Sequence, residues 1–262
     1  MKSVLTIAGS DTCAGAGIQA DIKTMGACGV YGTCAITAPT AQNTLGVQAV
    51  HEVPPEFLAC QLDSVFADIF PDAVKIGMVR SPELITVIYD KLLQYQPRNI
   101  VLDPILVSTS GTSLLKPEAE HILKERLFPL VDVLTPNVLE CERLSGVAIR
   151  SQEDMENAVQ AMASQYHCAI ICKGGHLEGC ADDLLYSGGA FEWFRGKRVL
   201  CQNNHGTGCT YSSAFASALA LGRTLSEAAA FSKGYMAGAL SDGLDIGQGN
   251  GPLNHFWRQY GH

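Results

Sequence analysis

The 262-residue sequence has no dense cluster of basic residues: 18 lysines and arginines stand against 26 aspartates and glutamates, for a net charge of −8. A nucleic-acid or anionic-membrane partner would need a basic footprint, so the composition argues against both. No apolar run approaches the length of a membrane span, and residues 1–10 turn polar too soon for a signal peptide. We therefore expect a cytoplasmic protein that acts on small molecules.

The sequence also lacks features that would divide or cross-link the chain. No Pro/Ser/Gly-rich linker, low-complexity stretch or internal repeat separates two parts, so we expect one domain over residues 1–262. The ten cysteines include no C-x-x-C pair, and Cys168 and Cys172 have no second ligand pair nearby. This distribution favours buried, reduced thiols over disulfides and metal ligands.

Short β-rich runs alternate with stretches of helical length. The expected strands are residues 4–8, 34–38, 73–76, 100–102, 131–134 and 169–172, and the expected helices include 81–94, 117–126 and 151–165. This alternation predicts an α/β protein in which helices cover both faces of a mainly parallel sheet. Ligands of such sheets bind beyond the carboxyl ends of the strands, so the polar residues directly after the strands are the candidate site.

Two glycine-rich segments are candidates for binding phosphate. Gly15, Gly17 and Ala20 match a G-x-G-x-x-A dinucleotide pattern, but the next expected strand ends without the acidic residue that such a site needs. No G-x-x-x-x-G-K-[ST] loop occurs. The stronger candidate is the glycine turn at 206–208, ahead of a helical stretch at 210–221, because N–H groups at a helix start bind phosphate oxygens. A plain glycine loop before a packing helix is the alternative.

Seven segments together carry a resemblance to a known family: residues 5–11, 15–21, 41–48, 135–137, 173–178, 205–209 and 251–256. The chain resembles the bacterial hydroxymethylpyrimidine/phosphomethylpyrimidine kinases of thiamine biosynthesis, within the ribokinase-like superfamily. The resemblance implies a ribokinase-like three-layer α/β/α sandwich. It also implies ATP-dependent phosphorylation of 4-amino-5-hydroxymethyl-2-methylpyrimidine to its monophosphate and then to its diphosphate. A pyridoxal/pyridoxine kinase of the same superfamily is the alternative, and a non-catalytic nucleotide- or pyrimidine-binding regulator is a third interpretation.

The resemblance assigns roles around the transferred phosphate. Gly206, Thr207 and Gly208 form an anion hole, and Cys209 takes the position of the base, where many sugar-kinase relatives have an aspartate. The pKa of a free thiol is about 8.5, and a helix N-terminus can lower it, so Cys209 could act as the base when substrate and metal are in place. An inert buried cysteine is the alternative.

On the nucleotide side, the resemblance places ATP at Asn137, Lys173 and Thr207, with Lys173 next to the transferring phosphate. It places Mg²⁺ near Asp103 and Glu140, commonly through water, and leaves a monovalent cation open. Carboxylate oxygens are hard ligands that suit Mg²⁺. Relatives are usually homodimers, so we expect one here.

On the substrate side, Gln42 is the candidate for recognising the aminopyrimidine edge, because an amide presents a donor and an acceptor side by side. Asp11 is the candidate for holding the substrate, and Met78 resembles the apolar wall that the family presents to the ring. Loop capping, a turn and core packing are the ordinary alternatives for these three side chains. Residues 107–112 resemble a mobile lid over the phosphates.

Two departures from the family pattern put the fine specificity in doubt. Cys13 and Ala14 stand where small Ser or Gly residues are usual, and Asn203 and Asn204 precede the glycine turn where a threonine is common at the second position. Three histidines show no metal-binding spacing and are expected to be structural: His176, His205 and His255.

Overall fold

The computed structural model describes residues 1–106, 115, 117–175, 181–199, 201, 203–242 and 244–260, with only the backbone of Pro117 and Tyr260. The strands are β1 (Ser3–Asp11), β2 (Tyr31–Asn43), β3 (Gly46–Val50), β4 (Ala73–Ile76), β5 (Ile100–Leu102), β6 (Val133–Leu134), β7 (Ala169–Cys172), β8 (Asp183–Ser187) and β9 (Ala190–Phe194). The helices are α1 (Gly17–Ala27), α2 (Pro55–Asp68), α3 (Pro82–Tyr95), α4 (Pro117–Ile122), α5 (Val138–Ser145), α6 (Gln152–Tyr166), α7 (Thr207–Ala220), α8 (Leu225–Ser241) and α9 (Trp257–Tyr260).

These strands form one sheet in the order β3-β2-β1-β4-β5-β6-β7-β8-β9. Strands β1, β2 and β4 to β7 run parallel, while β3, β8 and β9 pair antiparallel with their neighbours at the two edges. From β1 the chain passes first to β2 and then to β4 on the other side of β1. The connections therefore change direction between β1 and β4, and ligands of open α/β sheets bind in the crevice at such a switch point.

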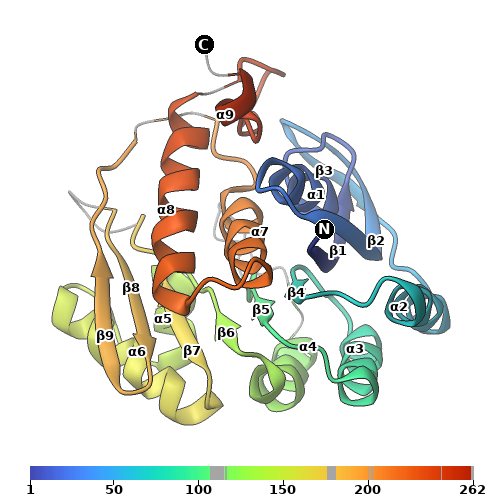
Figure 1. Ribbon diagram of the computed structural model, residues 1–262, viewed down its shortest axis with the longest axis horizontal. Coiled ribbons are helices and arrows are strands. Elements are labelled where there is room, and N and C mark those ends of the chain that lie inside the picture. The colour runs from blue at the N-terminus through green and yellow to red at the C-terminus, as the bar shows by residue number, and fades with distance from the viewer. Residues whose placement is uncertain are drawn as a thin grey trace.

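Helices cover both faces of the sheet (Figure 1): α1, α7 and α8 pack on one face, and α2 to α6 pack on the other. Successive side chains of a strand point to opposite faces. Accordingly, Ile100 and Leu102 join the core under α2 to α6, while Val101 between them joins the core under α7 and α8. Because both faces are covered, the parallel strands are mostly apolar, with exceptions such as the buried polar residues Thr6 in β1 and Lys75 in β4. The predicted three-layer α/β/α sandwich is confirmed.

Most predicted elements lie within two residues of their observed positions. Helices predicted at 81–94 and 151–165 are α3 and α6, each shifted by one residue, and the strand predicted at 131–134 shortens to β6. The helix predicted at 117–126 is divided, because α4 gives way to a π-helical turn at Leu123–Leu127. The edge strands β3, β8 and β9, each five residues long, were not predicted.

Helix α7 is the central helix of its layer, and all its residues from Cys209 to Ala220 are buried. A helix that is small and apolar on every side is typical of such a position. None of the described helices combines the length and the apolar character that a membrane crossing demands. The nine cysteines in the described residues form no disulfide, but only Cys141, Cys172 and Cys209 are buried, so the prediction of mostly buried thiols is wrong.

The segment after α8 packs against α7 through a buried histidine. Nε2 of His255 lies 3.1 Å from the hydroxyl of Thr210, and the hydroxyl of Tyr235 donates a hydrogen bond to the His255 carbonyl. Burial lowers the pKa of His255 from 6.5 to about 4. The folded protein therefore holds this ring neutral, as its expected structural role requires.

Replacing His255 by glutamine is expected to flatten the pH dependence of stability between pH 6.5 and 4. In this window the unfolded chain protonates its histidine and the folded chain does not, so stability is complete above pH 6.5 and falls as the pH decreases toward 4. The wild type should lose up to about 3 kcal/mol through this group. Urea unfolding at several pH values measures the difference. His121→Gln, at a side chain that is 77% exposed, is the control and should keep the wild-type slope.

Candidate active site

A cavity of about 1550 Å³ lies at the carboxyl edge of the sheet, around the β1/β4 switch point. Its wall contains every residue that the sequence predicted for the site: Asp11, Gln42, Met78, Asp103, Asn137, Glu140, Lys173, Gly206, Thr207, Gly208 and Cys209. These residues come from separate strand ends and from the start of α7. The fold therefore brings the predicted residues to one cavity.

The start of α7 faces this cavity with unpaired backbone N–H groups. Gly206 is the N-cap, in the left-handed region at φ 85°, and the first intrahelical bond runs from the Thr210 N–H to the Gly206 carbonyl at 2.9 Å. The N–H groups of Gly208 and Cys209 find no acceptor among the described residues, as is usual in a first helical turn. Together with the helix dipole they form a site suited to an anion.

Gly206 also lets two glycine turns pack together. A Cβ at this position would lie 1.8 Å from the carbonyl oxygen of Gly15, so a larger residue is excluded by the backbone of the loop before α1. The segment that resembles a dinucleotide motif therefore serves as a packing surface for the start of α7. Its first glycine is also close to His205, since a Cβ there would lie 2.4 Å from the ring.

Gly206→Ala is expected to destabilise the protein and to abolish most of its activity, because the start of α7 must move. Gly222→Ala is the matched control: its φ is +84°, nothing lies within 4 Å of the added Cβ, and only the backbone strain of about 1 kcal/mol applies. Gly206→Ala should cost at least about 1 kcal/mol more than the control in urea unfolding. Equal losses in the two variants would contradict the clash.

Cys209 is the third residue of α7 and is buried. Burial raises the pKa of this thiol to about 11; the ammonium of Lys75 opposes the rise, and the carboxylates of Asp21 and Asp103 add to it. Desolvation is therefore a larger effect on the pKa of this thiol than the lowering that a helix N-terminus can produce. Cys209 is a neutral thiol here.

A fully buried ion pair lies in the core beside α7. Nζ of Lys75 on β4 is 3.0 and 2.9 Å from the two carboxylate oxygens of Asp21 on α1, and both side chains have no exposed surface. The Asp21 carboxylate also accepts hydrogen bonds from Thr6 at 2.6 Å and from Ser213 of α7 at 2.7 Å. The pair therefore connects α1, β1, β4 and α7 at one point. Neither charged residue was predicted from the sequence.

Asp103, Lys173 and Glu140 form the charged side of the cavity. Nζ of Lys173 donates to Oδ1 of Asp103 at 2.8 Å, and the Thr135 hydroxyl donates to the same oxygen at 3.2 Å. Oδ2 of Asp103 faces the start of α7, since a Cβ on Gly208 would lie 2.9 Å from it. The Asp103–Lys173 pair is thus adjacent to the N–H groups of the first helical turn.

Glu140 and Asn137 are engaged in the cap of α5. The Asn137 side chain accepts from the Glu140 N–H at 2.9 Å, while the Glu140 carboxylate accepts from the N–H groups of Asn137 at 2.9 Å and Leu106 at 3.2 Å. Burial raises the pKa of Glu140 to about 7, and Lys173 opposes this rise. Capping leaves each Glu140 oxygen with further acceptor capacity, so the carboxylate chemistry fits a hard cation.

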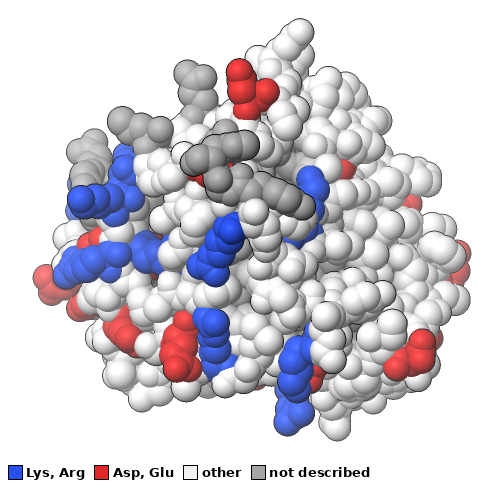
Figure 2. Space-filling model, turned by 45° about the horizontal axis from the view of Figure 1, so that its top comes forward, with Lys and Arg blue, Asp and Glu red and all other residues white. Residues whose placement is uncertain are grey.

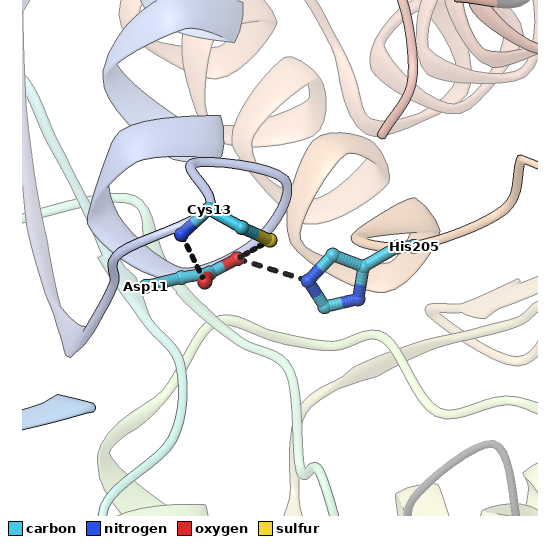
Figure 3. Close-up of side chains that lie close together, drawn as sticks. All are labelled: Asp11, Cys13 and His205. Carbon is cyan, nitrogen blue, oxygen red and sulfur yellow. Dashed lines mark hydrogen bonds and ion pairs between the residues drawn. The ribbon is translucent and has the colours of Figure 1, made fainter. Parts of the chain in front are cut away.

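The predicted substrate side chains lie at the other end of the cavity. The Gln42 amide nitrogen lies 3.1 Å from Nε2 of His205, and this ring nitrogen lies 2.9 Å from Oδ2 of Asp11 (Figure 3). Burial alone would raise the pKa of Asp11, but hydrogen bonds from His205 and from the N–H groups of Ala16 and Cys13 lower it to about 2. His205, expected only to be structural, is therefore in contact with two predicted substrate-binding residues.

Met78 closes this end on the apolar side. Its Cε would lie 2.7 Å from a Cβ on Gly9, so the glycine after the buried part of β1 is what gives the thioether room. The Met78 carbonyl accepts a hydrogen bond from Thr37 at 2.8 Å, which fixes its backbone against β2. The wall that the sequence predicted at Met78 is thus held by two strands.

Sequence reasoning missed the basic residues that line the cavity. They are Arg80, Arg195, Lys197, Arg198 and Lys233. Three of them lie within residues 195–198, directly after β9, so the short basic run was a readable signal. On the face shown in Figure 2, several Lys and Arg side chains lie close together at the left of the view, and others are scattered over the rest of the face. Their position suits the phosphates of a small ligand. Residues 107–112, the predicted lid, and His176 lie outside the described residues.

A helix start suited to an anion, a lysine and two carboxylates at the switch point of this sandwich are typical of a small-molecule kinase of the ribokinase-like class. A sequence model of the family described as phosphomethylpyrimidine kinase matches residues 11–254. The chain therefore belongs to the phosphomethylpyrimidine kinase family, and the resemblance seen in the sequence is confirmed.

Individual relatives support this assignment. The hydroxymethylpyrimidine/phosphomethylpyrimidine kinase of Rhizobium meliloti is 47% identical over 97% of both chains. The thiamine biosynthesis bifunctional protein of Geobacter sulfurreducens is 48% identical over 97% of this chain, which spans only 52% of that protein.

Two solved structures share the fold. Phosphomethylpyrimidine kinase from Clostridium difficile 630 aligns with a TM-score of 0.83 at 43% identity, over 90% of this chain and 98% of its own. An ADP complex of Bacillus subtilis pyridoxal kinase aligns with a TM-score of 0.91 at 32% identity, over 99% of this chain and all of its own. Backbone similarity alone thus does not separate the two substrate classes.

Proposed function

We propose that the protein transfers the terminal phosphate of ATP to the hydroxyl of 4-amino-5-hydroxymethyl-2-methylpyrimidine, and then a second phosphate to the monophosphate. The observation that carries this proposal is the layout of one cavity. Asp11, Gln42 and Met78 lie at one end, and the Asp103–Lys173 pair lies against the start of α7. An acceptor at the first end would have its hydroxyl directed toward the anion site.

In this proposal Gly206, Thr207 and Gly208 stabilise the charge that develops on the transferred phosphate. Lys173 contacts that phosphate, and ATP is further held by Asn137 and Thr207. Gln42 recognises the aminopyrimidine edge. It must exchange its present contacts for the substrate, because its amide oxygen lies 3.3 Å from the Thr40 hydroxyl and its nitrogen faces His205.

Asp103 and Glu140 are the residues that would hold Mg²⁺, directly or through water. Their oxygens fit a hard cation, and Oδ2 of Asp103 accepts no hydrogen bond from the described residues. When bound, Mg²⁺ neutralises charge on the ATP phosphates. The same proposal includes a monovalent cation, a single domain over residues 1–262 and a cytoplasmic location. It also includes a homodimer, which light scattering tests.

Pyridoxal is the second candidate substrate, because the pyridoxal kinase of Bacillus subtilis aligns closely over the whole chain. The β2–β3 hairpin favours the pyrimidine: it contains the segment 41–48 and places Gln42 in the cavity wall. The deciding experiment supplies ATP and Mg²⁺ with the hydroxymethylpyrimidine, its monophosphate or pyridoxal, and counts the phosphates on each product over time. Diphosphate formation supports the proposal, whereas phosphorylation of pyridoxal alone overturns it.

A further inference from the structure

Asp11, Cys13 and His205 bring three different metal-ligating groups to one point (Figure 3). Oδ2 of Asp11 lies 2.9 Å from Nε2 of His205 and 3.4 Å from Sγ of Cys13, and the three ligand atoms all lie within 4.8 Å of one another. The edges of a tetrahedral zinc site are about 3.3–3.5 Å long, for bonds of about 2.0–2.3 Å. Side-chain movements of about an ångström or less would place all three atoms around one ion.

The surrounding backbone holds two of these ligands in position. Oδ1 of Asp11 accepts the Cys13 N–H at 2.9 Å, and Oδ2 accepts the N–H groups of Gly15 and Ala16 at 3.1 and 2.9 Å. The loop before α1 thus wraps around the carboxylate. The N–H of His205 donates a hydrogen bond to the Gly251 carbonyl at 3.2 Å, which holds the backbone of this third ligand. Such outer contacts are what orient metal ligands in proteins.

The chemistry of this group differs from that of the proposed magnesium site. A thiolate, an imidazole and a carboxylate are the ligands that zinc prefers, whereas Mg²⁺ prefers oxygen alone. The His205 side chain is 22% exposed and lines the cavity, so an ion can reach it from the solvent.

We infer that Asp11, Cys13 and His205 form a binding site for a thiophilic divalent cation such as Zn²⁺, with the fourth coordination position open to the cavity. Binding forms a metal–sulfur bond and breaks the S–H bond of Cys13, whose proton leaves to the solvent. The imidazole binds through Nε2 and carries its proton on Nδ1. No electron is transferred, so no oxidant or reductant is needed.

The ion would occupy the end of the cavity at which the proposed substrate binds. Nε2 of His205, one of the proposed metal ligands, lies 3.1 Å from the amide nitrogen of Gln42. Zinc and the pyrimidine would therefore exclude each other or share the open position. Either case makes the apparent substrate affinity depend on zinc.

The test uses the full chain without an affinity tag, stripped of metal. Zn²⁺ is titrated in competition with the chromophoric chelator 4-(2-pyridylazo)resorcinol. Wild type and the control Cys60→Ser, at an exposed thiol on α2, should each retain one equivalent. Cys13→Ser and His205→Asn should bind at least about tenfold more weakly. Unchanged affinity in Cys13→Ser, or equal losses in Cys60→Ser, would overturn the site.

A second measurement identifies the ligand directly and does not need the proposed kinase activity. Co²⁺ bound through a thiolate gives a sulfur-to-metal charge-transfer band, which should appear in wild type and be absent in Cys13→Ser. If Cys13→Ser does not fold, Cys13→Ala serves the same purpose, since the residue lies in a partly exposed loop. A band that persists in both variants assigns the ion to another cysteine and contradicts the inference.

Discussion

Replacing Cys209 by alanine is expected to slow phosphate transfer to the hydroxymethyl group by about 10²–10⁴-fold, the usual contribution of a general base. Transfer to the monophosphate should change little. A hydroxyl must lose its proton as it attacks, whereas a phosphate monoester is largely ionised near pH 7 and has no such proton to lose. Single-turnover assays of the two steps, each with its own acceptor, measure the difference.

The pH profile of the wild type provides a second check on this role. Because burial raises the pKa of Cys209 to about 11, only a small fraction is thiolate at pH 7. The first transfer should therefore accelerate with rising pH, by up to about tenfold per pH unit between 7 and 9, whereas the second should stay nearly flat. Cys209→Ala should remove this slope from the first step.

Cys141→Ala is the matched control for these measurements. This cysteine is also buried, but it belongs to α5 and packs in the core of the opposite layer. It should alter stability without separating the two steps. Equal loss of both transfers in Cys209→Ala, at unchanged fold, would show that the thiol fills space at the start of α7 and does not act as a base.

The layout of the site could be predicted from the sequence because parallel strands put their carboxyl ends at one edge. Asp11, Met78, Asp103 and Lys173 each follow a run that is recognisably a strand, so their meeting in one cavity follows from the fold class. The family resemblance then distinguished these positions from ordinary turn residues. Edge strands β8 and β9 were not predicted, so the basic residues of the loop after β9 were not recognised as part of the site.

The electrostatics of the site could not be predicted, because they depend on contacts between distant segments. The pKa of Cys209 is set by how deeply α7 is buried between α1, α8 and the sheet, and this depth is not encoded in its neighbours along the chain. In the same way, the contact of His205 with Asp11 joins residues 194 positions apart. The sequence around Cys209 or His205 shows no residue spacing that is typical of a metal site or a catalytic motif.

Replacing Lys75 by methionine is expected to destabilise the protein by about 3–5 kcal/mol, because the Asp21 carboxylate would remain buried without its partner. Lys2→Met is the matched control. Lys2 also pairs with an aspartate, Asp72, but its side chain is 54% exposed, and such surface pairs contribute below about 1 kcal/mol. Urea unfolding compares the losses of stability in the two variants. Similar losses would contradict the prediction that Lys75→Met leaves an unpaired charge in the core.

The double variant Lys75→Met/Asp21→Asn separates the structural role of this ion pair from its electrostatic role. Asparagine can accept a hydrogen bond from one of the two hydroxyls, Thr6 or Ser213, through its oxygen and donate to the other through its amide nitrogen, so the link between β1 and α7 is kept while both charges are removed. More than half of the lost stability should return.

The double variant also changes the charges around Cys209. The Lys75 ammonium opposes the rise in the pKa of Cys209, and the Asp21 carboxylate adds to this rise; both are absent in the double variant. Because the lysine has the larger of these two effects, the thiol should become harder to ionise, and the first transfer should slow more than the second. A double variant that recovers stability and keeps the wild-type ratio of the two rates would limit the pair to a structural role.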